Sequence, residues 1–176
     1  MGFFILFHMQ KMTKVFPSNL RSKHYGLTND GTNVMLFRHQ YSKVFDTDYR
    51  ETIMYDHDDV LSLYLDSIPT FRGDALVVGL GYGLLGYNYR SQCDSFLYLD
   101  NSTEIIEMIS PYVQDCEVEY ADAFEYATDR KFDCIFLDIF HRPVENHNTK
   151  LQSLIDRFSI MLKPGGELSY LKVEID

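Results

Sequence analysis

Four glycines between residues 79 and 86 form the densest group of residues in this sequence that could serve a ligand. In "GLGYGLLG", Gly81, Gly83 and Gly86 fit the pattern G-x-G-x-x-G, between one apolar run and the next. Glycine lets the backbone turn sharply and approach a ligand without a Cβ atom in the way. The pattern predicts a strand–turn–helix unit that holds an adenosine-bearing molecule, and it also fits a tight crossing that holds nothing.

Aspartates end three of the apolar runs that we interpret as strands. Asp100 ends "LYLD", about twenty positions past the glycines, where a carboxylate can accept hydrogen bonds from ribose hydroxyls or cap the next helix. Asp122, followed by Ala123, and Asp138 come after the next two strands. Carboxylates at successive strand ends line one crevice of an open α/β sheet. An acidic crevice opposes the pyrophosphate of a dinucleotide and attracts a cationic sulfonium.

The elements that must position these residues alternate after residue 70. Apolar runs alternate there with helical patterns, and this alternation predicts a parallel, doubly wound, Rossmann-like sheet. We expect strands at 75–80, 95–100, 116–121, 132–140 and 167–175. We expect helices from Leu84, over 102–113 with Ser102 or Thr103 as cap, and over 149–163 before "PGG", with a helical turn at 123–128.

Before residue 70 the chain has short β-rich segments separated by turns. "NDG" at 29–31 predicts a hairpin, because Asp30-Gly31 can adopt the positive φ of a tight turn. Apolar residues between 49 and 68 recur at helical spacing, so we expect a helix there. The sequence thus predicts a small β-rich N-terminal segment ending in a helix (1–70) and a Rossmann-like ligand-binding domain (71–176).

Composition narrows the classes of partner. The formal charge of −10 disfavours nucleic acid and anionic lipid as partners. Three separated cysteines, with no CxxC pair, indicate a reducing, cytoplasmic environment. The opening "MGFFILFH" is too short to span a membrane and lacks the features of a signal peptide. His57 in "DHDD" has no second histidine at i+4, so we expect no metal site.

An ordered series of motifs resembles class I S-adenosylmethionine (SAM)-dependent methyltransferases, and more closely their spermidine synthase-like branch. The series is "ALVVGLGYG", "LYLDNSTEIIEMISPYV", "YADAFEYA", "FDCIFLDIF" and "LKPGGELSYL", preceded by "YRETIMYDH". It extends from about residue 24 to 173. The resemblance implies that the amino-acid end of the adenosyl ligand passes over Gly79, Gly81 and Gly83. It also implies that Asp100 binds the ribose hydroxyls and that Asp122 and Ala123 flank the adenine.

On the acceptor side, the resemblance implies that Asp138 holds and helps deprotonate an amine, and that Tyr49 and Glu51 close over it. The sequence departs from the family's motifs at two places. Tyr82 replaces the aspartate of the aminopropyltransferase glycine loop, and its ring can stack on a sulfonium instead. "DIFHRP" at 138–143 replaces D-S-S-D-P, which removes part of the clamp for a polyamine.

In that altered motif, His141 is a candidate general base, or a loop histidine bonded to backbone or water. Arg142 suits an anionic acceptor or the ligand's own carboxylate. The chain ends after the predicted fifth strand, where family members continue with a helix and a hairpin, so we expect a C-terminally truncated sheet. Its edge needs a cover, either the N-terminal segment or a second subunit, which favours a homo-oligomer.

The predicted function is transfer of a methyl or aminopropyl group from SAM, or its decarboxylated form, to a small, amine-bearing acceptor. No metal is required. The first alternative is a catalytically inert relative that keeps the fold for binding or assembly. The second is an NAD-dependent oxidoreductase, which only the glycine pattern and Asp100 favour.

Overall fold

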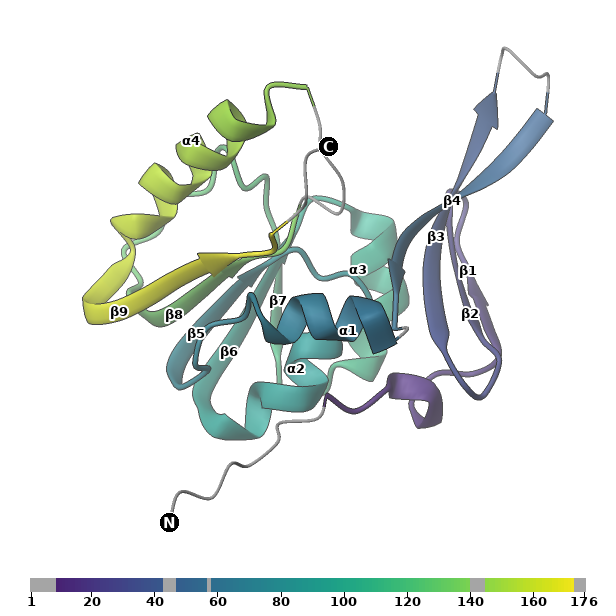
Figure 1. The fold of residues 1–176 in the computed structure, drawn as a ribbon, viewed down its shortest axis with the longest axis horizontal. Helices are drawn as coiled ribbons and strands as arrows, with labels where there is room; N and C mark the ends of the chain where they lie inside the picture. The colour runs from purple at the N-terminus through teal and green to yellow at the C-terminus, as the bar shows by residue number, and fades with distance from the viewer. Residues whose placement is uncertain (1–8, 43–46, 57, 140–144, 173–176) are drawn as a thin grey trace.

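The computed structural model describes residues 9–42, 47–56, 58–139 and 145–172 (Figure 1). Five strands form a parallel sheet in the order β7-β6-β5-β8-β9, which confirms the predicted Rossmann-like α/β fold. The order reverses between β5 and β8, the place where open α/β sheets bind ligands. The bounds are β5 (Gly73–Val78), β6 (Cys93–Asp100), β7 (Glu117–Tyr120), β8 (Phe132–Leu137) and β9 (Leu162–Tyr170).

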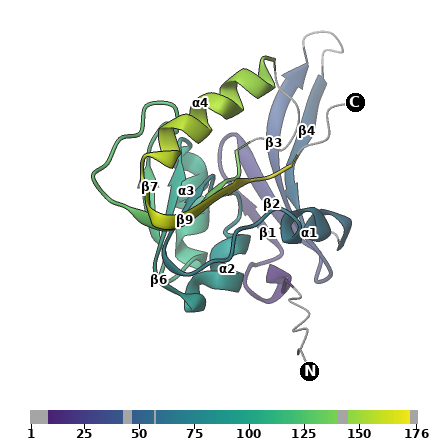
Figure 2. The same ribbon diagram turned by 60° about the vertical axis from the view of Figure 1, so that its left-hand side comes forward.

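Helices cover both faces of this sheet (Figure 2). One face packs on α4 (His147–Ser159), and the other on α2 (Leu84–Tyr89) and α3 (Thr103–Ile109). Because side chains alternate along a strand, Val77 of β5 points to the α2–α3 side and Leu76 to the α4 side. Ser102 caps α3 as predicted: its Oγ accepts a hydrogen bond from the Ile105 N–H at 3.3 Å.

A second, antiparallel sheet precedes the parallel one, in the order β1-β2-β3-β4. Its bounds are β1 (Asn19–Arg21), β2 (Tyr25–Asn29), β3 (Val34–Ser42) and β4 (Thr47–Tyr55). The predicted hairpin at "NDG" is confirmed between β2 and β3. Asp30 Oδ1 accepts hydrogen bonds from the N–H groups of Thr32 and Asn33, both at 2.7 Å, and Gly31 takes the positive φ of 85°.

Two element predictions are wrong. Where we expect a helix over 49–68, β4 continues to Tyr55 and α1 spans only Asp58–Leu65. Pairing with β3 overrides the helical spacing, because it buries Glu51 and Met54 and leaves Thr52 exposed. The "PGG" predicted to end a helix lies inside β9 instead, at an irregularity in its pairing with β8.

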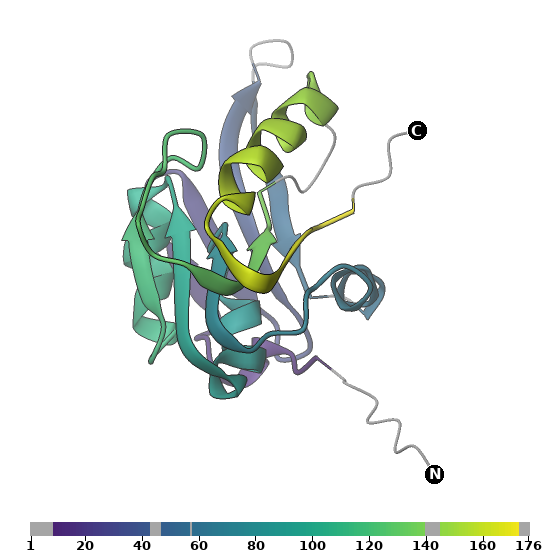
Figure 3. The same ribbon diagram turned by 90° about the vertical axis from the view of Figure 1, so that its left-hand side faces the viewer.

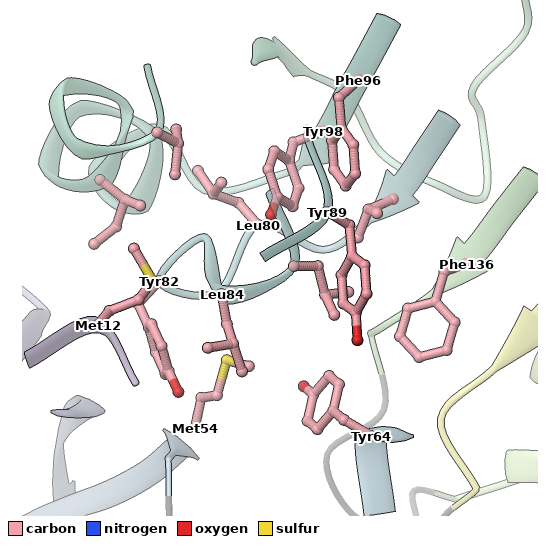
Figure 4. Close-up of a cluster of buried hydrophobic side chains, with 14 of the residues drawn as sticks. Met12, Met54, Tyr64, Leu80, Tyr82, Leu84, Tyr89, Phe96, Tyr98 and Phe136 are labelled. Carbon is pink, nitrogen blue, oxygen red and sulfur yellow. The ribbon is translucent and has the colours of Figure 1, made fainter. Parts of the chain in front are cut away.

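The two sheets share one hydrophobic core. Met12, from the short helix η1 (Met12–Lys14), and Met54 of β4 pack with Tyr82 and Leu84 of the glycine turn and α2 (Figure 4). The antiparallel sheet and β9 lie at opposite ends of the molecule (Figures 1 and 3). Among the described residues no strand pairs with the outer edge of β9, so the homo-oligomer stays a prediction.

Candidate functional site

A cavity of about 280 Å³ lies at the carboxyl ends of the parallel strands. Its floor comes from the loops after β5, β6, β7 and β8, and its roof from β2, β3, β4 and α1. A more open groove of about 480 Å³ shares Tyr25, Arg38, Asn101 and Ser102 with it. The cavity lining brings together five of the residues predicted for the adenosyl ligand: Gly79, Gly81, Asp100, Asp122 and Ala123.

The glycine turn lies against the end of β8. Gly79 has a φ of 109°, and a Cβ atom there would stand 2.2 Å from the carbonyl oxygen of Asp138. A Cβ at Gly81 would stand 2.7 Å from Sδ of Met54 in the roof. Gly83 is different, because it does not line the cavity: it precedes α2 with a φ of 82° and packs on Val113. Gly83 was predicted to contact the ligand, and the structure instead gives it a packing role against Val113.

Asp100 ties the glycine turn to the start of α3. Its Oδ2 accepts a hydrogen bond from the Leu80 N–H at 2.9 Å, and its Oδ1 accepts one from the Ser102 N–H at 2.8 Å. Burial raises the pKa of this carboxyl group, and the N–H groups of Leu80, Ser102 and Asn101 oppose that shift. Asp100 also lines the cavity, and a carboxylate has about four acceptor sites, so it can still accept from a ribose hydroxyl.

Asp122, Ala123 and Phe124 form the wall after β7. Asp122 Oδ1 accepts a hydrogen bond from the Phe124 N–H at 2.8 Å, and its carbonyl oxygen accepts one from Tyr126 N–H, which tightens this turn. Ala123 is buried, whereas the ring of Phe124 is 38% exposed beside the cavity. An apolar surface with a carboxylate beside it suits the face and the amino group of an adenine.

Asp138 projects into the cavity from the end of β8, next to the glycine turn. Tyr64 of α1 also lines the cavity, and its hydroxyl donates to Oδ1 of Asp138 at 2.8 Å and to Oδ2 at 2.9 Å. Burial raises the pKa of Asp138 to about 7; the Tyr64 hydroxyl opposes this shift and the charge of Asp100 adds to it. Burial and the neighbouring carboxylate hold the Tyr64 pKa well above 10, so the hydroxyl stays a donor.

The predicted stacking of Tyr82 on a sulfonium is corrected. The Tyr82 side chain is fully buried beside Met12 and Met54 (Figure 4) and does not line the cavity. Its ring meets the ring of Phe16 edge-on at 6.3 Å. Its hydroxyl has no hydrogen-bond partner within the part of the chain that the structure describes. The glycines on either side of Tyr82 take positive φ values, and the turn they form directs this ring into the shared core.

Tyr49 and Glu51 lie on β4 and do not line the cavity themselves. The Tyr49 hydroxyl donates to Gln40 Oε1 at 2.5 Å, and the Gln40 amide donates to the Glu51 carboxylate. Glu51 in turn pairs with Arg38, 3.3 Å away, which does line the cavity. The predicted acceptor-side pair therefore reaches the cavity through Arg38. His141 and Arg142 lie outside the described residues.

Sequence reasoning missed the roof. Tyr25, Arg38, Ile53, Met54 and Tyr64 line the cavity from the N-terminal part of the chain. The helix expected over 49–68 concealed β4, and the irregular pairing of β3 with β4, which leaves Ile53 without a partner on β3, has no counterpart in the sequence pattern. Nothing in the sequence shows that this face covers the parallel sheet.

The described residues contain no group of three or more histidine, cysteine, aspartate or glutamate side chains that could hold a metal ion. None of the helices in these ranges has the length and apolar character needed to cross a membrane.

Solved structures share the Rossmann-like methyltransferase fold of this chain. The DhpI–SAM–HEP complex is 22% identical, with a TM-score of 0.52, and the match covers 64% of this chain and 53% of that one. An S-adenosylmethionine-dependent methyltransferase from Clostridium acetobutylicum ATCC 824 is 18% identical, with a TM-score of 0.50, covering 64% and 47%. The chain spans about half the length of these structures. No protein-family model and no curated protein matches it.

Proposed function

We propose that the chain binds SAM in this cavity and transfers its methyl group to a small, amine-bearing acceptor. The observation that carries the proposal is the alignment of an open glycine turn with carboxylates at three successive strand ends in one cavity: Asp100, Asp122 and Asp138. The solved structures with the same fold, one of them in complex with SAM, support it.

The residues present fit an adenosyl ligand. Gly79 and Gly81 let the turn pack closely on the Asp138 carbonyl and on Met54, and both glycines also line the cavity, so the amino-acid end can pass over the backbone of this turn. Asp100 has the remaining lone pairs to accept ribose hydroxyls, and Asp122 with Ala123 has the position for the adenine. We propose that residues 71–176 hold the adenosyl ligand and that residues 1–70 supply the roof over the acceptor.

Bound SAM supplies an electrophilic methyl group on a sulfonium. The chain's own residues position the acceptor and shield the reaction from water. With its pKa raised to about 7, Asp138 is matched to take a proton from the acceptor's ammonium group, which frees the nitrogen lone pair for attack on the methyl group. Of the charged side chains lining the cavity, three are aspartates and one is Arg38, so a cationic amine suits this space better than an anion.

Ligand-induced thermal stabilisation tests this function. SAM, S-adenosylhomocysteine (SAH), decarboxylated SAM, methylthioadenosine and NAD are compared, each at about a hundred times its dissociation constant. A true ligand adds about 2.7 kcal/mol to the free energy of unfolding at that ratio. We expect stabilisation by SAM and SAH; preference for decarboxylated SAM would indicate aminopropyl transfer instead.

Two variants of β6 sharpen the test. Asp100→Ala should abolish the stabilisation, because it removes the ribose acceptor. Asp94→Ala removes an exposed carboxylate near the opposite end of the same strand and should leave it unchanged. If no adenosyl compound stabilises the wild type, the enzyme reading fails and the inert binding or assembly protein takes its place. Stabilisation by NAD alone would favour the oxidoreductase.

A further inference from the structure

Tyr64 and Asp138 make a polar contact between two parts of the chain that are 74 residues apart. The Tyr64 side chain is 4% exposed, and its hydroxyl donates to both carboxylate oxygens, at 2.8 and 2.9 Å. A donor shared between two oxygens fixes the plane of the carboxylate, and each oxygen keeps lone pairs that face the cavity. The contact therefore aims a carboxylate at one point of the cavity.

That point is where the sulfur of an adenosyl ligand must lie. In SAM the sulfur joins the ribose to the amino-acid end, so it stands between the groups that hold those two parts. Here those groups are Asp100 and the glycine turn. Asp138 is adjacent to both: its backbone carbonyl packs on Gly79, and the Asp100 charge raises its pKa.

We propose that the Tyr64–Asp138 pair makes this cavity select a cationic sulfonium over a neutral thioether, with Tyr64 as the positioning residue. The inference rests on the proposed function and adds to it a preference between substrate and product. In the transfer the S–CH3 bond breaks with its electron pair left on sulfur, the lone pair of the acceptor nitrogen forms the new N–CH3 bond, and the proton of that nitrogen passes to Asp138 or to water. The ligand loses its positive charge, and with it the attraction to Asp138.

Discrimination by charge requires Asp138 to be ionised. Because its pKa is raised to about 7, the group is mostly neutral below that pH and mostly charged above it. The preference for the sulfonium should therefore grow as the pH rises through neutrality. The titratable groups that act on Asp138 come from α1, β6 and the glycine turn; they are Tyr64, Asp100, Tyr98 and Tyr82. Two further charged residues, Arg38 of β3 and Asp122 after β7, line the same cavity.

This preference favours release of the product, because a carboxylate aimed at the sulfur binds the neutral thioether more weakly than the sulfonium. It does not speed the transfer itself, since the attraction is strongest before the sulfur loses its charge. A partly desolvated charge pair a few ångströms apart is worth about tenfold in affinity. We therefore expect wild-type protein to bind SAM about tenfold more tightly than SAH at pH 8, and with nearly equal affinity at pH 5.5.

Calorimetric titration with SAM and SAH between pH 5.5 and 8.5 tests the proposal without any acceptor. The measured quantity is the ratio of the two dissociation constants. Asp138→Asn should hold this ratio near its acidic value at every pH. Tyr64→Phe keeps the ring but removes the donor that lowers the Asp138 pKa, so the midpoint of the ratio should move to higher pH. Its affinity for SAH should stay within about twofold of wild type.

Tyr126→Phe is the matched control. Tyr126 is also buried, and its hydroxyl also donates to a carboxylate, that of Glu119 at 3.4 Å, but it does not line the cavity. This variant should keep the wild-type profile. A pH-independent ratio in wild type, or a Tyr64→Phe profile equal to that of Tyr126→Phe, would overturn the proposal while SAM and SAH still bind. If neither ligand binds the wild type, the proposed function itself fails, and this inference with it.

Discussion

Asp138 illustrates how a binding residue lowers the stability of the protein that carries it. Its pKa rises from 3.8 in the unfolded chain to about 7 in the fold, so folding favours the protonated form. The resulting stability is fully present below about pH 4 and is lost as the pH rises towards 7. Above that pH an ionised carboxylate is held in a buried place, where a neutral group would be more stable.

Asp138→Asn should therefore stabilise the free protein at pH 8 and have little effect at pH 4. The gain at pH 8 is up to about 4 kcal/mol, from a shift of 3.8 to about 7 at about 1.4 kcal/mol per pKa unit. Asparagine keeps an oxygen that can accept the Tyr64 hydroxyl. Urea unfolding at both pH values measures the difference; equal effects at the two would show that ionisation of Asp138 is not the cause.

Gly79 combines a positive φ with a place in the cavity lining. The backbone of Gly79 has a φ of 109°, which side chains disfavour. A Cβ atom at this position would stand 2.2 Å from the Asp138 carbonyl oxygen, which cannot move without shifting β8. Gly79→Ala should cost at least about 3 kcal/mol of stability. It should also reduce SAH binding, because the turn that lies under the ligand is displaced.

Gly31→Ala separates the cost of a positive φ from the cost of the clash with the Asp138 carbonyl. Gly31 also has a positive φ, 85°, but nothing lies within 4 Å of its Cβ position. Its alanine variant should lose only about 1 kcal/mol and bind SAH as wild type does. Urea denaturation and calorimetry measure both quantities. Equal losses for the two glycines would mean that contact with Asp138 contributes nothing.

Residues at strand ends could be predicted from the sequence, and residues on the roof could not. Asp100, Asp122 and Asp138 follow apolar runs whose order fixes which edge of the sheet they share. Tyr64 belongs to the same cavity but sits within a helix whose spacing indicates only an apolar face. Its contact with Asp138 depends on how α1 packs, and local patterns do not encode that packing.

At the scale of elements, one carboxylate fastens the antiparallel sheet to α3. Glu104 accepts hydrogen bonds from Ser22 Oγ at 2.6 Å and the His24 N–H at 2.9 Å, and its Oε1 meets His24 Nδ1 at 2.5 Å. The Ser22 and His24 donors lower the pKa of Glu104 to about 2. Its contribution is therefore present above about pH 4.5 and is lost only as the pH falls towards 2.

Glu104→Gln should loosen the β1–β2 end of that sheet. An amide is a weaker acceptor than a carboxylate, and one of its two oxygens is lost. Amide hydrogen exchange should become faster in Asn19–Asn29 and stay unchanged in β5 and β6. Glu107→Gln, an exposed position one turn along the same helix, is the control and should change neither segment. Unchanged exchange in Glu104→Gln would mean that the shared core alone holds the sheet in place.

The sequence predicts some strands correctly and misses one, β4, and the reason is physical. The three inner strands of the parallel sheet, β5, β6 and β8, are buried on both faces, so their continuous apolar runs identify them without any knowledge of their neighbours. β4 is different because its first four residues are all exposed and only Glu51 and Met54 in it are buried, so its pairing with β3 decides its conformation. A strand that depends on its partner is where a periodicity argument fails.

At the scale of the whole molecule, the cavity exists because two sheets share one core. Met12 and Met54 from the antiparallel part pack on the glycine turn, and this packing sets the height of the roof above the floor. The groove that continues from the cavity runs along the same junction, between β2–β3 and the start of α3. Acceptor space is thus a property of how the two parts meet, not of either sheet alone.

A ligand in this cavity should consequently protect both parts from hydrogen exchange. We expect SAH to slow exchange in the floor, at residues 79–83 and 121–124, and also in the roof, over β4 and α1. The roof should respond because Ile53, Met54 and Tyr64 line the same space as Gly79 and Asp100. α4 packs on the opposite face of the sheet from α2 and α3, and β9 forms an edge strand; neither element lines the cavity, so both serve as the internal control. Protection confined to the floor would show that the adenosyl ligand does not reach the roof, and the Tyr64 side of the cavity would then belong to the acceptor alone.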